Sequence, residues 1–365
     1  MIKNPFKYGS VVSGIDFCGR SKNIHELTQF IESGQNVVLQ GERRIGKTSL
    51  VYETVKRMNK RQLLLVDLME VKTIEDVCTR TLRALVQLEQ KSVFKTLAHL
   101  RPSLSVNSVT GDLSVSLGST SDLNAESIAD ILKLISKNHA RKPLVIFFDE
   151  FQDILKVDNN KAILAQLRGE IQYQGDVPYI FAGSIRNHMD DIFNHPDSPF
   201  FKSAISLDVG PLSKQDFEAF LKEKFRAGKR QAEPNLIPEI FKMTNCVTGD
   251  VQQICEALWS VTDEGEVIDE SQLSKALELI FSRERKSYEV ILAGLTANYL
   301  NILKALSECG GDHVTSARFV SKAKVANGST VTKALSSMQG KKLVFKHEGG
   351  WRFTNPFFGL WLLQV

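Results

Sequence analysis

The sequence predicts an α/β protein, in which a parallel sheet covered by helices is followed by a helical segment and a small C-terminal module. Three patterns predict it. Short, continuously apolar stretches alternate with helical patterns up to Gly210-Pro211, as in parallel strands that are buried on both faces and joined by crossover helices. The strand signal stops after that dipeptide. Strands are predicted again only near the C-terminus, around a Gly-rich turn.

Five apolar stretches are the predicted strands of the sheet. A crossover helix is predicted between the second and the third of them, because Ile128, Ile131, Leu132 and Ile135 recur at helical spacing. The strands are expected at residues 37–40, 63–67, 144–149, 179–183 and 205–209.

One segment departs from this alternation of strands and helices. Apolar and polar residues alternate over 104–106 and again over 113–117, on either side of a turn at 110–112. This pattern predicts a β-hairpin, inserted near 103–118 ahead of the third strand. It either contacts a partner or is a passive edge.

The remainder of the chain predicts two further domains. Residues 212–282 are helical, with Val251, Ile254 and Leu258 on one apolar face. Three helices and a two-stranded ribbon, the arrangement of a winged helix-turn-helix, follow them. The expected domains are a core over 1–211, a helical lid over 212–282 and a winged helix over 283–365. Within the last, helices are expected near 299–308, 316–323 and 329–338, and strands near 343–346 and 351–354.

Composition excludes several classes of protein. The 365 residues are 42% hydrophobic and 24% charged, as in soluble globular proteins. No apolar run has the length of a membrane span, and the N-terminus lacks a secretion signal. The five cysteines are scattered without a C-x-x-C pair, which favours reduced thiols over zinc ligands or disulfides. We therefore expect a cytoplasmic protein without a membrane partner.

Charge is distributed unevenly along the chain. From Arg283 to the C-terminus there are 12 Lys and Arg against 5 Asp and Glu, whereas the rest holds 34 against 37. A basic module of this kind suggests an acidic partner, such as duplex DNA, although a solvated charged face is the alternative.

Residues 41–48 match the pattern G-x-x-x-x-G-K-[ST] of a phosphate-binding loop. Its glycines let backbone N–H groups approach the phosphates, Lys47 supplies a charge for the outer phosphates, and the Thr48 hydroxyl ligates Mg²⁺. A strand precedes the loop and a helical pattern follows it. The alternative is a glycine turn that binds nothing. The predicted cofactor-binding residues are Gly41, Glu42, Arg43, Arg44, Ile45, Gly46, Lys47, Thr48 and Ser49.

A pair of acids ends the third predicted strand. Asp149 would hold Mg²⁺, mostly through water, and Glu150 would accept a proton from the attacking water. Alone, such a pair is more often an acidic turn. Ser184, after the fourth strand, would bond that water or the γ-phosphate, although serine after glycine is also ordinary turn chemistry. The predicted catalytic residues are therefore Glu150, Lys47 and Ser184, and the predicted metal ligands are Thr48 and Asp149.

These segments resemble the ATPases described mainly from Archaea, in the STAND branch of the AAA-plus superfamily of P-loop NTPases. The resemblance rests on residues 17–20, 41–50, 148–153 and 181–184, and residues 353–361 are similar to the end of that family's winged helix. It implies ATP between the core and the lid, with residues 17–20 near the base. It also implies that nucleotide state controls association, for instance a homo-oligomer formed on ATP binding.

Departures from the AAA-plus pattern bear on the rate of hydrolysis. Lys202 stands near the place where many relatives carry an arginine that reaches a neighbour's γ-phosphate, and Gln252 and Gln253 stand where many carry a sensor arginine. Lysine lacks the planar fork of arginine. Arg168 and Arg186 are candidate substitutes, although surface arginines are common. These departures favour slow turnover and a switch over a motor.

The sequence of the winged helix predicts a basic surface that lacks side chains able to read bases. The second helix of a helix-turn-helix is the one that enters the major groove, and here it has no Arg or Asn/Gln pair placed to read bases. DNA contact and protein docking therefore both remain possible functions of this module. Lys341, Lys342, Lys346 and Arg352 could lie against phosphates. Ser329, Thr330, Lys333, Ser336 and Ser337 are expected on the exposed face, and Val331, Leu335 and Met338 in the core.

The sequence accommodates three functions. The first is an ATP-dependent switch that controls association with a protein or DNA partner. The second is a DNA-binding ATPase loaded or remodelled on DNA, as in replication initiators and transposition ATPases. The third is a nucleotide-binding structural subunit with vestigial hydrolysis. Nucleotide turnover with and without DNA separates them.

Overall fold

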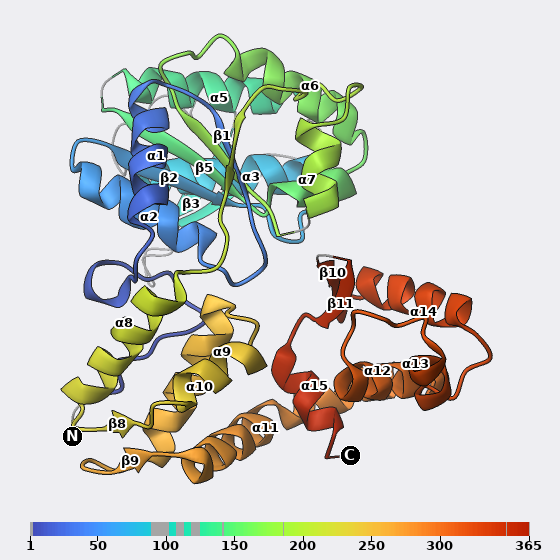
Figure 1. Cartoon of the computed structure of the whole chain (residues 1–365). Helices are drawn as coiled ribbons and strands as arrows, with labels where there is room; N and C mark the ends of the chain where they lie inside the picture. Colours follow the sequence, from blue (N-terminus) through green and yellow to red (C-terminus); the bar gives the residue numbers. More distant parts are fainter. Residues whose placement is uncertain are drawn as a thin grey trace. The chain divides into compact units, whose positions relative to one another are not determined.

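The computed structural model describes residues 3–88, 102–106, 113–117, 125–140, 142–184, 186–347 and 349–364. The chain divides into two compact units (Figure 1). One is Val11–Gly210, and the other joins Met1–Ser10 to Pro211–Val365. Contacts therefore group the first ten residues with the C-terminal half. The three domains expected from the sequence stay a prediction.

A five-stranded parallel sheet forms the centre of the first unit. In spatial order its strands are β2 (Gln62–Asp67), β5 (Leu144–Asp149), β6 (Tyr179–Ala182), β1 (Val37–Gln40) and β7 (Ile205–Asp208). Every neighbouring pair is parallel. All five predicted strands are confirmed, each to within one residue at either end. The α/β fold class is therefore confirmed.

Burial differs between the centre and the edges of this sheet. The strands β1 and β6 are buried throughout, and β5 is buried up to Asp149. The edge strand β7 has one buried residue, Leu207, and the edge strand β2 has two. The expectation of strands buried on both faces is thus wrong for the two edges, because each has a neighbour on one side only.

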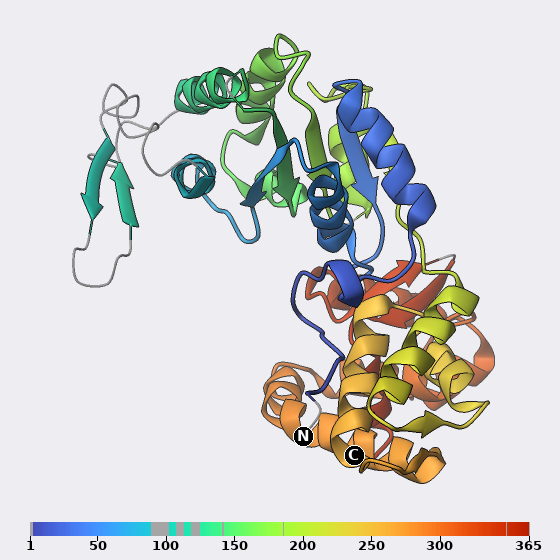
Figure 2. The same cartoon turned by 90° about the vertical axis from the view of Figure 1, so that its left-hand side faces the viewer.

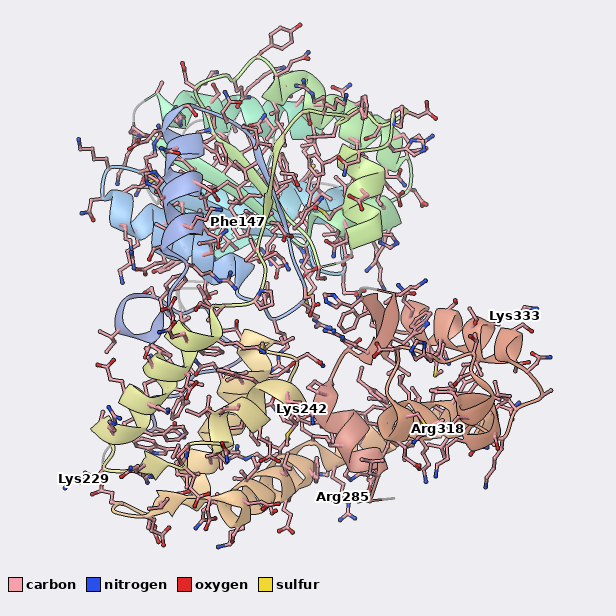
Figure 3. The ribbon with its side chains drawn as sticks, in the orientation of Figure 1. Phe147, Lys229, Lys242, Arg285, Arg318 and Lys333 are labelled. Carbon is pink, nitrogen blue, oxygen red and sulfur yellow. The ribbon has the colours of Figure 1, made fainter. Side chains whose placement is uncertain are left out.

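Helices cover both faces of the sheet (Figure 2). Alternation along β5 directs Phe147 and Phe148 into different hydrophobic clusters, and Figure 3 marks Phe147 within the first unit. The cluster of Phe147 includes α1 (Ser21–Glu32) and α2 (Lys47–Met58). The cluster of Phe148 includes residues of α3 (Ile74–Leu88), α5 (Ala125–His139), α6 (Asn160–Ile171), α7 (Arg186–Phe193) and the 3₁₀ segment η4 (Phe151–Lys156).

The predicted hairpin pairs as expected. Strands β3 (Pro102–Val106) and β4 (Leu113–Leu117) are antiparallel, with Leu104 opposite Val115, and they form a sheet of their own. Its turn lies outside the described residues.

The second unit begins with helices, as predicted, but also contains two short strands. The helices of residues 212–293 are α8 (Lys214–Ala227), α9 (Leu236–Met243), α10 (Thr248–Val261) and α11 (Glu270–Ala293). The strands β8 (Gln231–Ala232) and β9 (Val267–Ile268) pair in parallel. The expectation that strands are absent from 212–282 is wrong, because two-residue strands have no sequence period. The predicted boundary after residue 282 falls within the continuous helix α11.

The C-terminal part of this unit has the predicted winged-helix elements. They are α12 (Ala297–Cys309), α13 (Ala317–Lys322), α14 (Gly328–Gly340), β10 (Val344–His347) and β11 (Gly350–Phe353). Side chains of Thr296, Ser316 and Asn327 cap the three helices. A final helix, α15 (Pro356–Leu362), follows them and was not predicted.

The helix α15 is held by tertiary packing. Tyr288 of α11 is 1% exposed, and its ring centroid lies 5.2 Å from those of both Phe358 and Trp361. The Asn355 side chain accepts bonds from the first turn.

Among the helices in the described ranges, none combines the length and the hydropathy needed to cross a membrane.

Candidate nucleotide-binding site

The loop that follows β1 is shaped by backbone geometry that favours glycine. Arg44 lies at φ 64° and Gly46, at the start of α2, lies at φ 101°. Gly41 is constrained by packing: a Cβ on it would lie 2.5 Å from the carbonyl oxygen of Val209 and 3.3 Å from Cγ2 of Ile45. The first glycine of the motif is therefore required by the chain that follows β7.

The amino group of Lys47 is folded against this loop. Lys47 is 7% exposed, and its Nζ donates to the carbonyl oxygens of Gly41 at 2.8 Å and Glu42 at 2.9 Å. Burial lowers the pKa of Lys47, while the charges of Glu150 and Asp149 oppose that shift. A buried cation held by neutral carbonyls attracts an anion strongly. The first turn of α2 adds backbone N–H groups that have no partner within the helix.

Thr48 and Asp149 meet although a strand separates the elements that carry them. The strand β6 lies between β1 and β5, yet Oγ1 of Thr48 donates to Oδ2 of Asp149 at 2.5 Å. Burial is the largest cause that raises the pKa of Asp149, and the bond from Thr48 opposes it. Hydroxyl and carboxylate oxygens in contact suit Mg²⁺, which completes its shell with water and phosphate oxygens. The two predicted metal ligands therefore fit the ion.

Glu150 and Ser184 are also brought together. Glu150 lies at φ 49°, directly before η4, and its Oε2 accepts a bond of 2.8 Å from Oγ of Ser184. The same oxygen accepts a bond of 2.5 Å from Nε2 of Gln152. No sequence pattern assigned a role to Gln152. The only signal that could have found it is its place two residues after Glu150, in a segment that resembles the family motif.

Two further residues support the loop. The hydroxyl of Ser49 accepts a bond of 3.1 Å from the backbone N–H of Val12, so its contribution to a nucleotide would come from its own backbone. Nη2 of Arg20 donates to the carbonyl of Ile45 at 2.8 Å, and burial lowers the pKa of Arg20 to about 10. Of the remaining loop residues, Arg43 is exposed and Glu42 and Arg44 are half-buried.

Of the cations considered for the γ-phosphate, Lys202 and Arg168 make no hydrogen bond to these site residues within the described part of the chain. Lys202 is exposed, and its Nζ lies 5.2 Å from the ring centroid of Phe201. Arg168 lies in the last turn of α6 and is half-buried, and the side chain of Arg186 lies outside the described residues. In the second unit, Gln252 and Gln253 are 8% and 5% exposed within α10.

The winged helix presents the predicted surface except at Thr330, which is half-buried instead of exposed. Val331, Leu335 and Met338 of α14 are buried, Thr330 is half-buried, and Ser329, Lys333, Ser336 and Ser337 are exposed. Lys333 is marked on α14 in Figure 3. Next to it lies an open groove of about 250 Å³ without an acidic lining residue; it is lined by Thr296, Asn298, Tyr299, Ile302, Thr330, Lys333 and Ala334.

Comparison with known proteins agrees with this geometry. Residues 17–256 match the family described as an ATPase domain predominantly from Archaea. The chain belongs to this family. Residues 286–364 match a probable winged helix domain, so the protein is an archaeal-type ATPase with a C-terminal winged helix. No curated protein sequence matches the chain.

Solved structures share the fold of this archaeal-type ATPase. The Walker-type ATPase paby2304 of Pyrococcus abyssi is 17% identical, with a TM-score of 0.65 over 96% of this chain and 97% of its own. The Aeropyrum pernix ORC1 protein, solved in complex with DNA, is 13% identical, with a TM-score of 0.53 over 95% and 92%. The ORC2 protein of the same organism, in ADPNP–ADP complexes, is 13% identical, with a TM-score of 0.51 over 100% and 99%.

Proposed function

We propose that this ATPase binds Mg·ATP at residues 41–49, hydrolyses it slowly, and uses the change from ATP to ADP as a switch. The observation that carries the proposal is the convergence of three features: the buried Lys47, the 2.5 Å contact between Thr48 and Asp149, and the Glu150 carboxylate. Phosphoryl transfer to water needs a cation for the phosphates, a metal site and a base.

Each residue has a separate role in this proposal. Lys47 and the backbone N–H groups of the loop bind the phosphates. Mg²⁺ held by Thr48 and Asp149 would neutralise charge on the outer phosphates. Glu150 accepts a proton from the attacking water, and Ser184 holds its carboxylate. The switch belongs to the STAND type, in which nucleotide state controls association with a second copy or a protein effector.

We expect slow turnover because of the residues that stand where many relatives carry arginine. Lys202 points its amino group at a neighbouring ring, and the lid carries Gln252 and Gln253. A missing arginine finger costs about 10³-fold or more in rate, so we expect the isolated protein to turn over well below the roughly 1–100 s⁻¹ of efficient phosphoryl-transfer enzymes. The five cysteines form no disulfide bond, which suits the reducing cytoplasm.

The test separates binding from hydrolysis. Glu150→Gln replaces the carboxylate by a neutral amide of the same size, so ATP affinity should stay within about threefold while kcat falls about 10²–10⁴-fold, the usual contribution of a general base. Fluorescent-nucleotide titration and single-turnover phosphate release measure the two quantities. Undiminished turnover in this variant would refute Glu150 as the base. ATP binding without any turnover in the wild-type protein, with and without DNA, would support a structural subunit with vestigial hydrolysis.

The winged helix supports a second candidate function, weak duplex DNA binding through residues 283–365. Twelve basic against five acidic residues in this part, and the exposed face of α14 beside a groove without acids, favour phosphate contact. The Aeropyrum pernix relative solved with DNA points the same way. Because base-reading pairs are missing from α14, we expect little sequence preference. DNA that accelerates turnover would favour a loaded or remodelled ATPase over a protein-directed switch.

A further inference from the structure

Gln152 is a buried polar side chain that bonds to the carboxylate of Glu150. It is 2% exposed, and its Nε2 donates to Oε2 of Glu150 at 2.5 Å. Ser184 donates to the same oxygen at 2.8 Å. Two donors, one from η4 and one from the segment that follows β6, therefore hold one oxygen of the carboxylate that the proposed function uses as a base.

The residues on either side of Gln152 fix its position. The Phe151 ring lies in an aromatic cluster, 4.7 Å from Phe181 and 5.7 Å from Phe200, centroid to centroid. On the other side, the Asp153 carboxylate accepts bonds from the backbone N–H of Glu70 at 2.7 Å and from Lys156 at 2.9 Å. The backbone of Gln152 therefore cannot shift without disturbing both contacts.

The surroundings of the Gln152 side-chain amide also bear on its role. A Cβ on Gly183 would collide with Oε1 of Gln152 and with the side chain of Met189, so glycine at that position leaves room for both side chains. Oε1 of Gln152 has no hydrogen-bond partner among the described residues, and a buried, unpaired amide oxygen is unfavourable. A leucine would fill the same volume without that cost. Stability alone thus does not account for a glutamine here.

The geometry points to Gln152 as a positioning residue for Glu150, an inference that rests on the proposed function. The backbone of Glu150 lies in the left-handed region, at φ 49°, a conformation that is costly for a residue other than glycine and is found mostly at functional sites. Gln152 and Ser184 bind Oε2 and so leave Oε1 for the attacking water. In the hydrolytic step the water oxygen bonds to the γ-phosphorus, the bond from that phosphorus to the bridging oxygen breaks, and a water proton moves to Oε1.

The test compares two buried glutamines of the same unit. Gln152→Leu removes the bond to Glu150, and kcat should fall about 10–100-fold, as for loss of a hydrogen bond to a charged group. ATP affinity should stay within about twofold, because Gln152 contacts no phosphate-binding group. Gln174→Leu is the matched control: Gln174 is 8% exposed and bonds to Leu132 and Tyr179, so kcat should not change.

A double-mutant cycle distinguishes positioning from a general structural effect. In the Glu150→Gln background, Gln152→Leu should cause no further loss of the residual turnover, because the carboxylate it positions is already gone. Thermal unfolding of each variant shows that it is folded. Unchanged kcat in Gln152→Leu, or an equal loss in both backgrounds, would overturn the inference alone. A wild-type protein that binds ATP without turnover would overturn the proposed hydrolysis, and the inference with it.

Discussion

The nucleotide site and the winged helix both rely on lysines, but they hold them in opposite environments. Lys47 is 7% exposed, and two backbone carbonyls fix its amino group next to two carboxylates. Lys333 and Lys346 are exposed to solvent. A buried charge in a fixed geometry acts individually, because low local polarity strengthens each of its interactions. Exposed charges act collectively and are screened by salt. Substitutions and salt should therefore affect the two regions differently.

The largest expected effect is at Lys47. Lys47→Ala should abolish ATP binding, a loss of about 1000-fold or more, because it removes charge-assisted bonds to phosphate at a buried site. The matched change on the other surface, Lys333→Ala, should leave ATP affinity unchanged. Titration with a fluorescent nucleotide compares them. Equal losses in both variants would contradict the contrast between a buried and an exposed lysine.

Collective action by the exposed lysines is the second prediction. Replacing Lys341, Lys342 and Lys346 together by glutamine should weaken binding to two unrelated duplexes alike, on the order of 100-fold at 0.1 M salt. The log–log salt dependence should flatten by about one unit for each phosphate that is no longer neutralised. Fluorescence anisotropy of the full chain at two salt concentrations measures both. Absence of wild-type binding even at low salt would favour protein docking or a lid role for the winged helix.

The shape of the phosphate loop gives a smaller effect. Gly41→Ala places a Cβ 2.5 Å from the backbone oxygen of Val209, and a backbone atom cannot rotate away, so we expect about tenfold weaker ATP binding and a stability loss of about 1–3 kcal/mol. Gly169→Ala is the control, since a Cβ there meets no atom within 4 Å and alanine favours the helix by about 0.5–1 kcal/mol. Urea unfolding and nucleotide titration distinguish them. A destabilised Gly169→Ala would show that the contrast is not steric.

The pH dependence of ATP binding should show the buried charges directly. Burial raises the pKa of Asp149, so its carboxyl binds a proton at higher pH than in the unfolded chain. Mg-dependent affinity should therefore fall, by up to about tenfold per pH unit, as pH drops through that raised pKa. Burial lowers the pKa of Lys47, so affinity should also fall at alkaline pH, below the usual lysine range. Asp149→Asn should remove the acid limb only; an unchanged acid limb would assign it to another group.

Linkage gives these two groups a definite effect on the stability of the nucleotide-free protein. For Asp149, the folded state binds more protons than the unfolded state between the two pKa values, so stability falls as pH rises through that window. For Lys47 the folded state binds fewer protons, so stability rises with pH between its lowered pKa and the usual value. The charged forms of Asp149 and Lys47 thus lower the stability of the folded protein, as expected of residues whose role is to bind a ligand.

Local patterns in the sequence were sufficient to predict the strands of the sheet, the position of the loop at residues 41–48, and the place of Lys47 and Thr48 at its end. Apolar runs bounded by polar residues predicted the five strands, and their ends were correct to within one residue, although the two edge strands are less buried than expected. The residues 41–48 are contiguous, so their types fix the local backbone and place Lys47 and Thr48 at the start of a helix. Interactions between near neighbours decide such features, and near neighbours are visible in a sequence.

Packing of the folded chain was needed to show which distant groups meet. The order of the sheet sets β6 between β1 and β5, and only that order brings Thr48 to Asp149 and Ser184 to Glu150. The helix α15 has seven residues, too few to be stable alone, and it forms because Tyr288 packs against it. Gln152 has no periodic signal, since its role depends on a carboxylate and on the space beside Gly183. Contacts between segments far apart in the chain arise from packing of the whole fold, and no local pattern encodes them.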